Sequence, residues 1–290
     1  FTQIAKVLDE TKADYVKMDM NRHLTDVWSK TAGEQNQGAI LHRYMLGVYD
    51  FLERLHERYP ALLIEGCSGG GGRFDAGMLY YTPQIWCSDN TDAIERVKIQ
   101  YGTSFAYPSC TVGSHVSAVP NHQTGRTTEL ATRAAVAMAG SFGYELDLNL
   151  LTEEEKEQVR AQIKNYHRFE MLIRQGRYYR LTDVWQKKEY AAWEYCRPDG
   201  SEALVTVVTL DTQCNPATEY VKLRGLGEDK KYRVEVVGMQ TGGENGQRIN
   251  GTPNSVEPEY YTGAQLVHAG LPVPRLGNEY KSWQVYVKEV

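Results

Sequence analysis

The chain has 290 residues, of which 41% are hydrophobic and 24% charged, so it can bury a sizeable core and is predicted to form one large and one small domain. Its net charge of -5, with scattered lysines and arginines, gives no general attraction for nucleic acid or an anionic membrane. No apolar run approaches the roughly 18 residues of a membrane span. We therefore expect a small neutral substrate and neither nucleic acid nor a membrane as partner.

The cysteines predict neither a disulfide framework nor a zinc site, because there are five of them and none form a CxxC pair. Reduced thiols are expected, and no charged-then-apolar leader opens the chain, so a cytoplasmic location is predicted. We predict no metal ion and no cofactor.

The first 176 residues alternate between helical patterns and extended apolar runs. A helix is predicted over 1–11, a strand over 14–19 and a helix over 39–59, where apolar residues recur at helical spacing. Further strands are predicted at 61–66, 84–88, 111–117 and 142–146, and further helices at 91–106 and 128–139. This alternation predicts a parallel sheet, and the α/β barrel is the form that places carboxylates at the C-terminal ends of strands.

The count of five strands falls short of the eight that close such a barrel. Either the sheet is open, or the first three strands lie on sequence that is absent here. The chain also begins at Phe1, inside a predicted helix, rather than with Met. We therefore expect the start to be a cut.

The pattern changes after Gly176. Up to that point a helix runs from a capping box at Thr152 and Glu155 to about Gln175. Beyond it, short strands alternate with turns, one of them the hairpin Arg197-Pro-Asp-Gly200. Strands are predicted at 189–195, 203–210, 220–223, 232–237 and 283–287, with a long surface loop at 238–257. The predicted domains are a partial barrel at 1–176 and an antiparallel β-sandwich at 177–290.

The segment Lys17-Met-Asp-Met-Asn-Arg22 closes the first predicted strand. Alternation along the strand places Lys17, Asp19 and Asn21 on one face. A lysine two residues from an aspartate would hold that carboxylate ionised, as a nucleophile requires. On spacing alone, a buried Lys-Asp pair without chemistry is an equally good interpretation.

A second candidate segment, Trp86-Cys-Ser-Asp-Asn-Thr-Asp92, closes another strand and offers two carboxylates. Asp92 opens the following helix, where a carboxylate is more often a cap than a catalyst. Asp89 is therefore the predicted acid/base. The ring of Trp86 would favour the protonated form of Asp89, although without the motif core packing is a better interpretation of Trp86 than stacking on a sugar.

Between these segments lies Cys67-Ser-Gly-Gly-Gly-Gly-Arg73. It lacks the Gly-Lys-Ser/Thr of a phosphate loop and the spacing of a dinucleotide fingerprint. Consecutive glycines after a strand instead allow the backbone to approach a ligand closely. Arg73 is as well explained by a structural role as by substrate contact, and no nearby histidine would activate Cys67 as a nucleophile.

Together with Gly113-Ser-His-Val-Ser-Ala-Val-Pro-Asn121, these segments resemble bacterial α-galactosidases of glycoside hydrolase family 36. The resemblance implies a retaining glycosidase with a (β/α)8 barrel, which releases galactose from α-galactosides such as melibiose and raffinose through a covalent galactosyl-enzyme. Asp19 would be the nucleophile and Asp89 the acid/base. The implied substrate-binding residues are Lys17, Met18, Met20, Asn21, Cys67, Gly70, Arg73 and Trp86.

The same resemblance implies that much of the enzyme lies upstream, including the first barrel strands and an Asp-Asp pair that holds the galactose 4- and 6-hydroxyls. Family members are often tetramers, so a homo-oligomer is expected. At position 18 many members carry tryptophan, and Met18 changes the packing there rather than the chemistry. The alternatives are an α-N-acetylgalactosaminidase or a raffinose-type galactosyltransferase of the same fold, and a non-catalytic carbohydrate-binding fragment.

Overall fold

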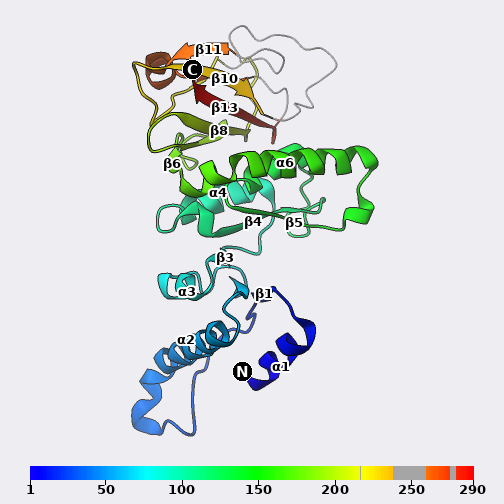
Figure 1. Cartoon of the computed structure of the whole chain (residues 1–290), viewed down its shortest axis with the longest axis vertical. Helices are drawn as coiled ribbons and strands as arrows, with labels where there is room; N and C mark the ends of the chain where they lie inside the picture. Colours follow the sequence, from blue (N-terminus) through cyan, green and yellow to red (C-terminus); the bar gives the residue numbers. More distant parts are fainter. Residues whose placement is uncertain (216, 238–258, 275–278) are drawn as a thin grey trace. The chain divides into compact units, whose positions relative to one another are not determined.

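The computed structural model describes residues 1–215, 217–237, 259–274 and 279–290, which form two compact units, 1–89 and 90–290 (Figure 1). The predicted loop at 238–257 lies outside the described residues. None of the described helices is long and apolar enough to cross a membrane.

The first unit contains three parallel strands in the order β1 (Tyr15–Met18), β2 (Leu63–Gly66) and β3 (Gln84–Trp86). Two helices, α1 (Thr2–Thr11) and α2 (Ile40–Arg58), lie where they were predicted, and a short 3-10 turn, Glu34–Ala39, precedes α2. Their apolar faces meet the sheet in one core, whose buried members are Leu8, Leu52, Leu55, Leu62, Ile64, Met78 and Ile85. The helical and strand patterns of this part are thus confirmed.

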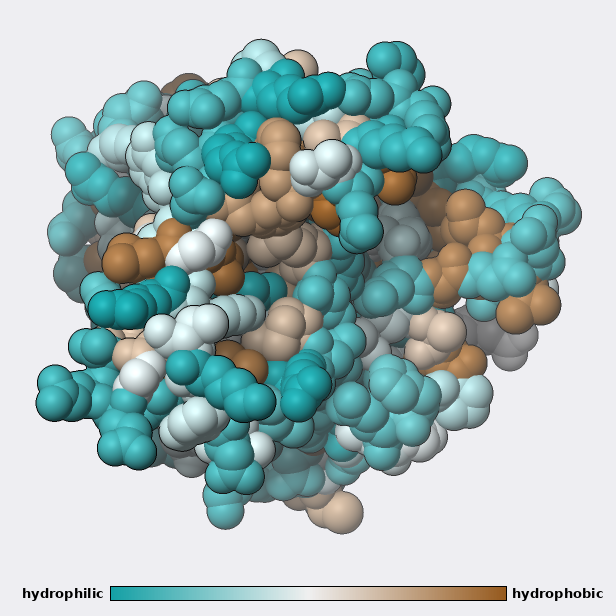
Figure 2. Space-filling model, turned by 90° about the horizontal axis from the view of Figure 1, so that it is seen from below, coloured by the Kyte–Doolittle hydropathy of each residue, from teal (hydrophilic) through white to brown (hydrophobic). Residues whose placement is uncertain are grey.

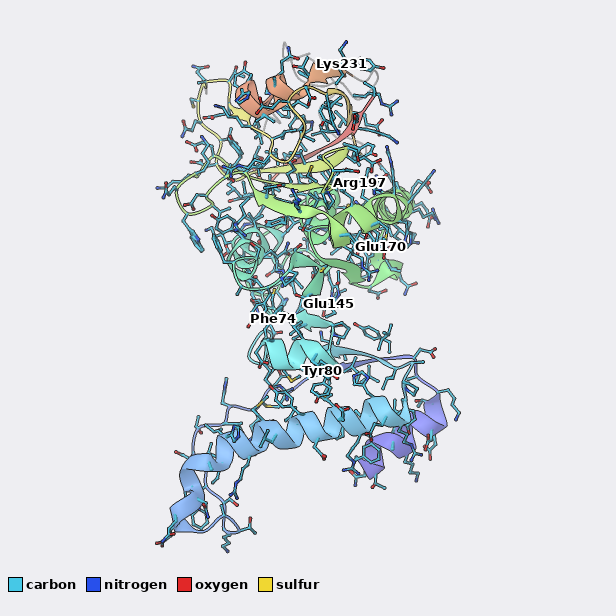
Figure 3. The ribbon with its side chains drawn as sticks, turned by 60° about the vertical axis from the view of Figure 1, so that its left-hand side comes forward. Phe74, Tyr80, Glu145, Glu170, Arg197 and Lys231 are labelled. Carbon is cyan, nitrogen blue, oxygen red and sulfur yellow. The ribbon has the colours of Figure 1, made fainter. Side chains whose placement is uncertain are left out.

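A third helix, α3 (Ala76–Tyr81), was not predicted. It begins at Asp75, whose carboxylate accepts a hydrogen bond from the Met78 amide at 2.9 Å. The helix is only six residues long, too short for a helical period to show in the sequence. It carries Tyr80, which is 78% exposed and meets Tyr81 edge to face (Figure 3).

Apolar side chains remain exposed on the first unit. Among the described residues, β1 is an edge strand that pairs with β2 alone. Figure 2 shows brown apolar side chains at the surface between teal hydrophilic ones. Exposed large apolar residues of this unit include Val7, Leu24, Trp28, Leu41, Leu46 and Leu63. An unpaired parallel edge together with exposed apolar surface is typical of a sheet that continues in further chain.

The second unit contains the parallel pair β4 (Val112–Ser117) and β5 (Ser141–Glu145). The helices α4 (Ala93–Thr103) and α5 (Leu130–Ala137) match the predictions, and α6 (Glu153–Gln175) starts at the predicted capping box. In Figure 1, α6 lies between the β4–β5 pair and the C-terminal sheet.

The C-terminal part is a six-stranded antiparallel sheet in the order β11-β10-β13-β8-β7-β6. The strands are β6 (Arg177–Arg180), β7 (Tyr190–Cys196), β8 (Glu202–Thr209), β10 (Lys231–Val236), β11 (Glu259–Thr262) and β13 (Ser282–Glu289). A two-stranded sheet, β9 (Tyr220–Val221) with β12 (Leu271–Pro272), and a π-helical turn, Gln265–Ala269, complete it. The predicted hairpin joins β7 to β8, with Gly200 at a φ of +72°.

Both faces of this sheet are buried, which explains why its central strands β7 and β8 are mostly apolar. Trp193 and Tyr195 face the core that contains Phe169 of α6. Ala192 and Cys196, on the other face of the same strand, belong to a second core. The alternation of polar and apolar residues that is typical of a strand with one solvent-exposed face is therefore absent from β7 and β8.

An acidic side chain, Glu194, lies inside this second face. Glu194 of β7 is fully buried, and its carboxylate accepts a hydrogen bond from the Arg224 amide at 2.7 Å. Burial raises the pKa of Glu194 to about 8, against the opposing effect of the hydrogen bonds from Arg224 and Cys196.

This raised pKa makes stability depend on pH. The folded protein keeps a proton on Glu194 that the unfolded chain releases. The contribution of Glu194 to the stability of the folded state is therefore fully present below the pKa that Glu194 has in the unfolded chain, and it is lost as pH rises through about 8. We expect Glu194→Gln to remove this loss. In thermal unfolding measured from pH 5 to pH 9, the melting temperature of the variant should rise relative to that of the parent as the pH increases. Parallel curves would contradict the assignment.

Candidate active site

The site is built where β1 and β2 end side by side. Met18 pairs with Gly66 in parallel register, and the Cys67 amide donates to the Met18 carbonyl at 2.9 Å. Asp19 and Cys67 therefore emerge together at the C-terminal edge of the sheet, where parallel α/β proteins place their reactive groups. Lys17 and Glu65 precede them by two residues on the same face.

Asp19 is exposed, and hydrogen-bond donors surround its carboxylate. Its carboxylate accepts hydrogen bonds from the amides of Met20 at 2.7 Å and Gly69 at 3.3 Å and from the Asn21 side chain at 3.0 Å. Partial burial acts to raise the pKa of Asp19, but hydrogen bonds from the Cys67 thiol, Asn21, Met20 and Gly69 outweigh it and the pKa lies below its usual value. The carboxylate is therefore ionised, as a nucleophile requires.

The cause of that ionisation differs from the prediction. Lys17 was expected to hold Asp19 ionised, yet its ammonium lies 3.9 Å from the carboxylate of Glu65 and 5.2 Å from the centre of the Trp86 ring. Neighbouring strands bring these partners together, and spacing along one strand could not reveal them. Asp19 instead relies on short-range donors from its own segment and from the glycine loop.

The glycine loop, residues 67–73, turns back on itself. The Ser68 amide donates to the Gly70 carbonyl at 2.9 Å, while the Ser68 hydroxyl donates to the Met20 carbonyl at 3.1 Å. The Gly69 amide reaches Asn21 at 3.1 Å as well as Asp19. Gly69 and Gly70 adopt φ values of +52° and +79°, which favour glycine.

The other side of this loop packs on the backbone that leads to Asp89. A Cβ on Gly70 would lie 2.8 Å from the Asp89 nitrogen and from the Ser88 Cα, and one on Gly71 would lie 2.6 Å from the Cys87 carbonyl oxygen. Nothing larger than glycine fits at either position without moving that backbone. The loop thus contacts the segments of both candidate carboxylates.

Cys67 and Arg73 frame the loop. Burial raises the pKa of the Cys67 thiol to about 11, with the hydrogen bond to Asp19 adding to the effect and the one to the Gly70 amide opposing it. The thiol is therefore a protonated donor to Asp19 rather than a nucleophile. Arg73 donates to the Cys67 carbonyl at 3.1 Å, which fixes the start of the loop.

Three further residues of the predicted substrate site, Met18, Met20 and Trp86, have other partners in the structure. Met18 packs with the apolar side chains of the first unit's core, on the face of β1 opposite Lys17, which argues against contact with a ligand. Met20 serves the site through its backbone, as donor to Asp19 and acceptor from Ser68. Trp86 is 2% exposed and offers its ring to the Lys17 ammonium.

Asp92 is a structural carboxylate, as its position in the sequence predicted. It caps α4 by accepting from the amides of Ile94 at 2.8 Å and Glu95 at 3.2 Å. It also pairs with Arg126 at 2.5 Å and is 2% exposed. Against the effect of burial, bonds from Thr124, Glu95, Arg126 and Ile94 hold the pKa of Asp92 below its usual value. The cap and the ion pair account for Asp92 as a structural residue.

Comparison with known families agrees with this geometry. Residues 1–176 match the family model for melibiase, and residues 190–287 match that for the glycosyl hydrolase family 36 C-terminal domain. The chain belongs to glycoside hydrolase family 36. Its five parallel strands, β1 to β5, are part of the (β/α)8 barrel predicted from the sequence, and the antiparallel sheet is the C-terminal domain.

Relatives in family 36 are longer than this chain. The bifunctional alpha-galactosidase/sucrose kinase AgaSK of Mediterraneibacter gnavus is 53% identical over 290 residues, which cover 100% of this chain and 28% of that protein. Alpha-galactosidase AgaA of Geobacillus stearothermophilus is 42% identical over 287 residues, or 99% of this chain and 36% of that protein. The chain thus spans about a third of the length of these relatives.

Solved structures of the family superpose on the whole chain. The galactosidase domain of AgaSK gives a TM-score of 0.86 at 52% identity and covers 100% of this chain and 36% of that chain. A variant of AgaA solved in complex with raffinose gives a TM-score of 0.89 at 42% identity, with 100% of this chain and 37% of that chain covered.

The glycine loop yields a direct test. Gly70→Ala places a Cβ against the backbone of Ser88 and Asp89 at a positive φ, so we expect a loss of about 1–3 kcal/mol in the free energy of unfolding. Gly47→Ala is the matched control, because Gly47 lies in α2 with nothing within 4 Å of an added Cβ, and it should be neutral or stabilising by up to ~1 kcal/mol. Equal denaturant midpoints for the two variants would contradict the packing described.

Proposed function

We propose that this chain is the C-terminal part of a retaining α-galactosidase, with Asp19 as the nucleophile and Asp89 as the acid/base. The observation that carries the proposal is the state of Asp19. It is an exposed carboxylate, held ionised by surrounding donors at the end of a barrel strand. The curated relatives named alpha-galactosidase match this segment along nearly its whole length.

In this proposal Asp19 attacks the anomeric carbon while Asp89 protonates the oxygen of the leaving group. A covalent galactosyl-enzyme forms, and Asp89 then takes a proton from water as that water displaces Asp19. Donors around Asp19 suit the second step, because they stabilise the carboxylate as it leaves. The glycine loop would set the spacing of the two carboxylates, since it contacts both of their segments.

Substrate contacts are proposed for Lys17, Asn21 and the glycine loop. Lys17 keeps donors available for sugar hydroxyls, since an ammonium carries three. Asn21 has its amide nitrogen on Asp19 and its oxygen on the Gly69 amide, which suits a residue that positions the nucleophile beside the sugar. The loop backbone from Cys67 to Arg73 would lie against the galactose 2-hydroxyl. Melibiose and raffinose are the proposed substrates.

We further propose a domain boundary near residues 176 and 177, which the ranges of the two family models support. The edge strand β1 and the exposed apolar residues of the first unit support a longer protein whose upstream part completes the barrel. A cytoplasmic location is supported by the cysteines, all five of which are free thiols. A homo-oligomer, by family resemblance a tetramer, is proposed for the complete enzyme.

The two carboxylate roles can be separated by the stereochemistry of azide rescue in the complete enzyme. Asp19→Ala should lower kcat on p-nitrophenyl α-galactoside by on the order of 10⁴-fold or more. Azide should then attack directly and give the β-galactosyl azide. Asp89→Ala should lower kcat by about 10²- to 10⁴-fold. Its covalent intermediate should react with azide from the opposite face and give the α-galactosyl azide.

The matched control is Asp92→Asn, which removes the cap of α4 and the ion pair with Arg126. It should lower stability but form no galactosyl azide, because both proposed catalytic groups remain. Formation of the same azide anomer by both alanine variants would overturn the assignment of roles.

The choice of sugar is testable by rate. A glycine backbone packed at the 2-position leaves no room for an N-acetyl group, so we expect kcat/KM for p-nitrophenyl α-galactoside to exceed that for the corresponding N-acetylgalactosaminide by about 100-fold or more. Comparable rates would favour the α-N-acetylgalactosaminidase, and a strong preference for sugar acceptors over water would favour the galactosyltransferase.

A further inference from the structure

A buried carboxylate beneath the proposed substrate site has no role in the reaction described above. Glu65 lies on β2, is 2% exposed, and is the register partner of Lys17 on β1. A charge buried this deeply in a sheet is strongly unfavourable unless it is paired. Its retention therefore needs a partner, and both of its partners come from β1.

Those partners are Tyr15 and Lys17. The Tyr15 hydroxyl donates to Glu65 Oε2, and the Lys17 ammonium lies 3.9 Å from Oε1. Oε1 is fully buried and accepts no hydrogen bond from any of the described residues. One carboxylate oxygen is thus fixed by the tyrosine, while the other is left facing the lysine.

The Trp86 ring also restricts the position of the Lys17 ammonium. The ammonium lies 5.2 Å from the centre of the Trp86 ring, a cation–π distance, and the Lys17 side chain is 35% exposed. The ammonium therefore sits between a buried anion and a buried aromatic face, with its remaining side open. Asp19 follows two residues later on the same face of the strand.

We propose that Glu65 is a positioning residue for sugar recognition, which acts by holding the Lys17 ammonium in place for the substrate. A free lysine side chain carries about 2 kcal/mol of rotamer entropy, which is lost when it binds a ligand. Glu65 removes part of that loss beforehand, because its charge attracts the Lys17 ammonium at 3.9 Å while the three N–H donors of the ammonium stay available for the sugar.

Charge compensation is a second effect of the same pair. The transition state of a retaining glycosidase resembles an oxocarbenium ion, so positive charge develops at the anomeric carbon beside Asp19. An unpaired ammonium two residues away would oppose that charge. The Glu65 carboxylate offsets the Lys17 charge and leaves Asp19 to stabilise the developing cation. This inference rests on the proposed function.

The test is a double-mutant cycle in the complete enzyme with p-nitrophenyl α-galactoside as the substrate. Glu65→Gln should lower kcat/KM by about 10- to 100-fold, because the ammonium is no longer held. In a Lys17→Ala background the same change should cost less than about 3-fold. An equal loss in both backgrounds would show that Glu65 does not act through Lys17 and would overturn the proposal.

Two further variants keep the result interpretable. Tyr15→Phe removes only the hydroxyl that fixes Glu65, and it should show the same dependence on Lys17 in smaller degree if Glu65→Gln fails to fold. Glu194→Gln is the matched control, because Glu194 is an equally buried carboxylate in the C-terminal sheet, and it should change kcat/KM by less than about 2-fold. A 10-fold loss there would mean that any buried glutamate has this effect, which would overturn the proposal.

The parent enzyme separates this inference from the function on which it rests. If the parent enzyme releases no nitrophenol, the proposed function and the inference about Glu65 both fail. If the parent is fully active and Asp19→Ala loses activity, the proposed function stands. Unchanged activity in Glu65→Gln would then overturn the role of Glu65 alone.

Discussion

The site depends on the close packing of a glycine backbone between two strand ends. Residues 67–73 donate a hydrogen bond to Asp19 from one side and lie against the Ser88–Asp89 backbone from the other. Side chains at these positions would hold the segments apart, and the positive φ of Gly70 would disfavour them as well. The approach of the two chain segments that carry Asp19 and Asp89 is therefore limited by main-chain atoms of the loop.

The order of elements could be read from the sequence because each element has a strong local cause. The capping box at Thr152, the hairpin at Gly200 and the apolar spacing of α2 are all local patterns, and the structure contains them at the predicted places. By contrast, α3 is too short to show a period, and β6 and β11 border or lie beside segments without clear alternation. The structure places them by contacts with other elements, since α3 packs against α2, β6 pairs with β7, and β11 pairs with β10.

The same distinction separates the parts of the site that the sequence could and could not predict. The position of Asp92 at a helix start predicted a cap, and the structure confirms that cap. The partner of Lys17 was predicted wrongly, because the register between β1 and β2 brings Glu65 to it from 48 residues away. A buried glutamate in an apolar strand was the available sign, since such a residue requires a partner. The assignment of Asp19 and Asp89 to their catalytic steps remains a prediction.

The glycine loop also bears on which nearby positions tolerate change. The atoms that a Cβ on Gly70 or Gly71 would meet are main-chain atoms, namely the Cys87 carbonyl, the Ser88 Cα and carbonyl carbon, and the Asp89 nitrogen. Every residue type has these atoms, so no substitution at 87, 88 or 89 would make room for a side chain on either glycine. Libraries that aim to alter selectivity should therefore keep Gly70 and Gly71, whatever other positions they diversify.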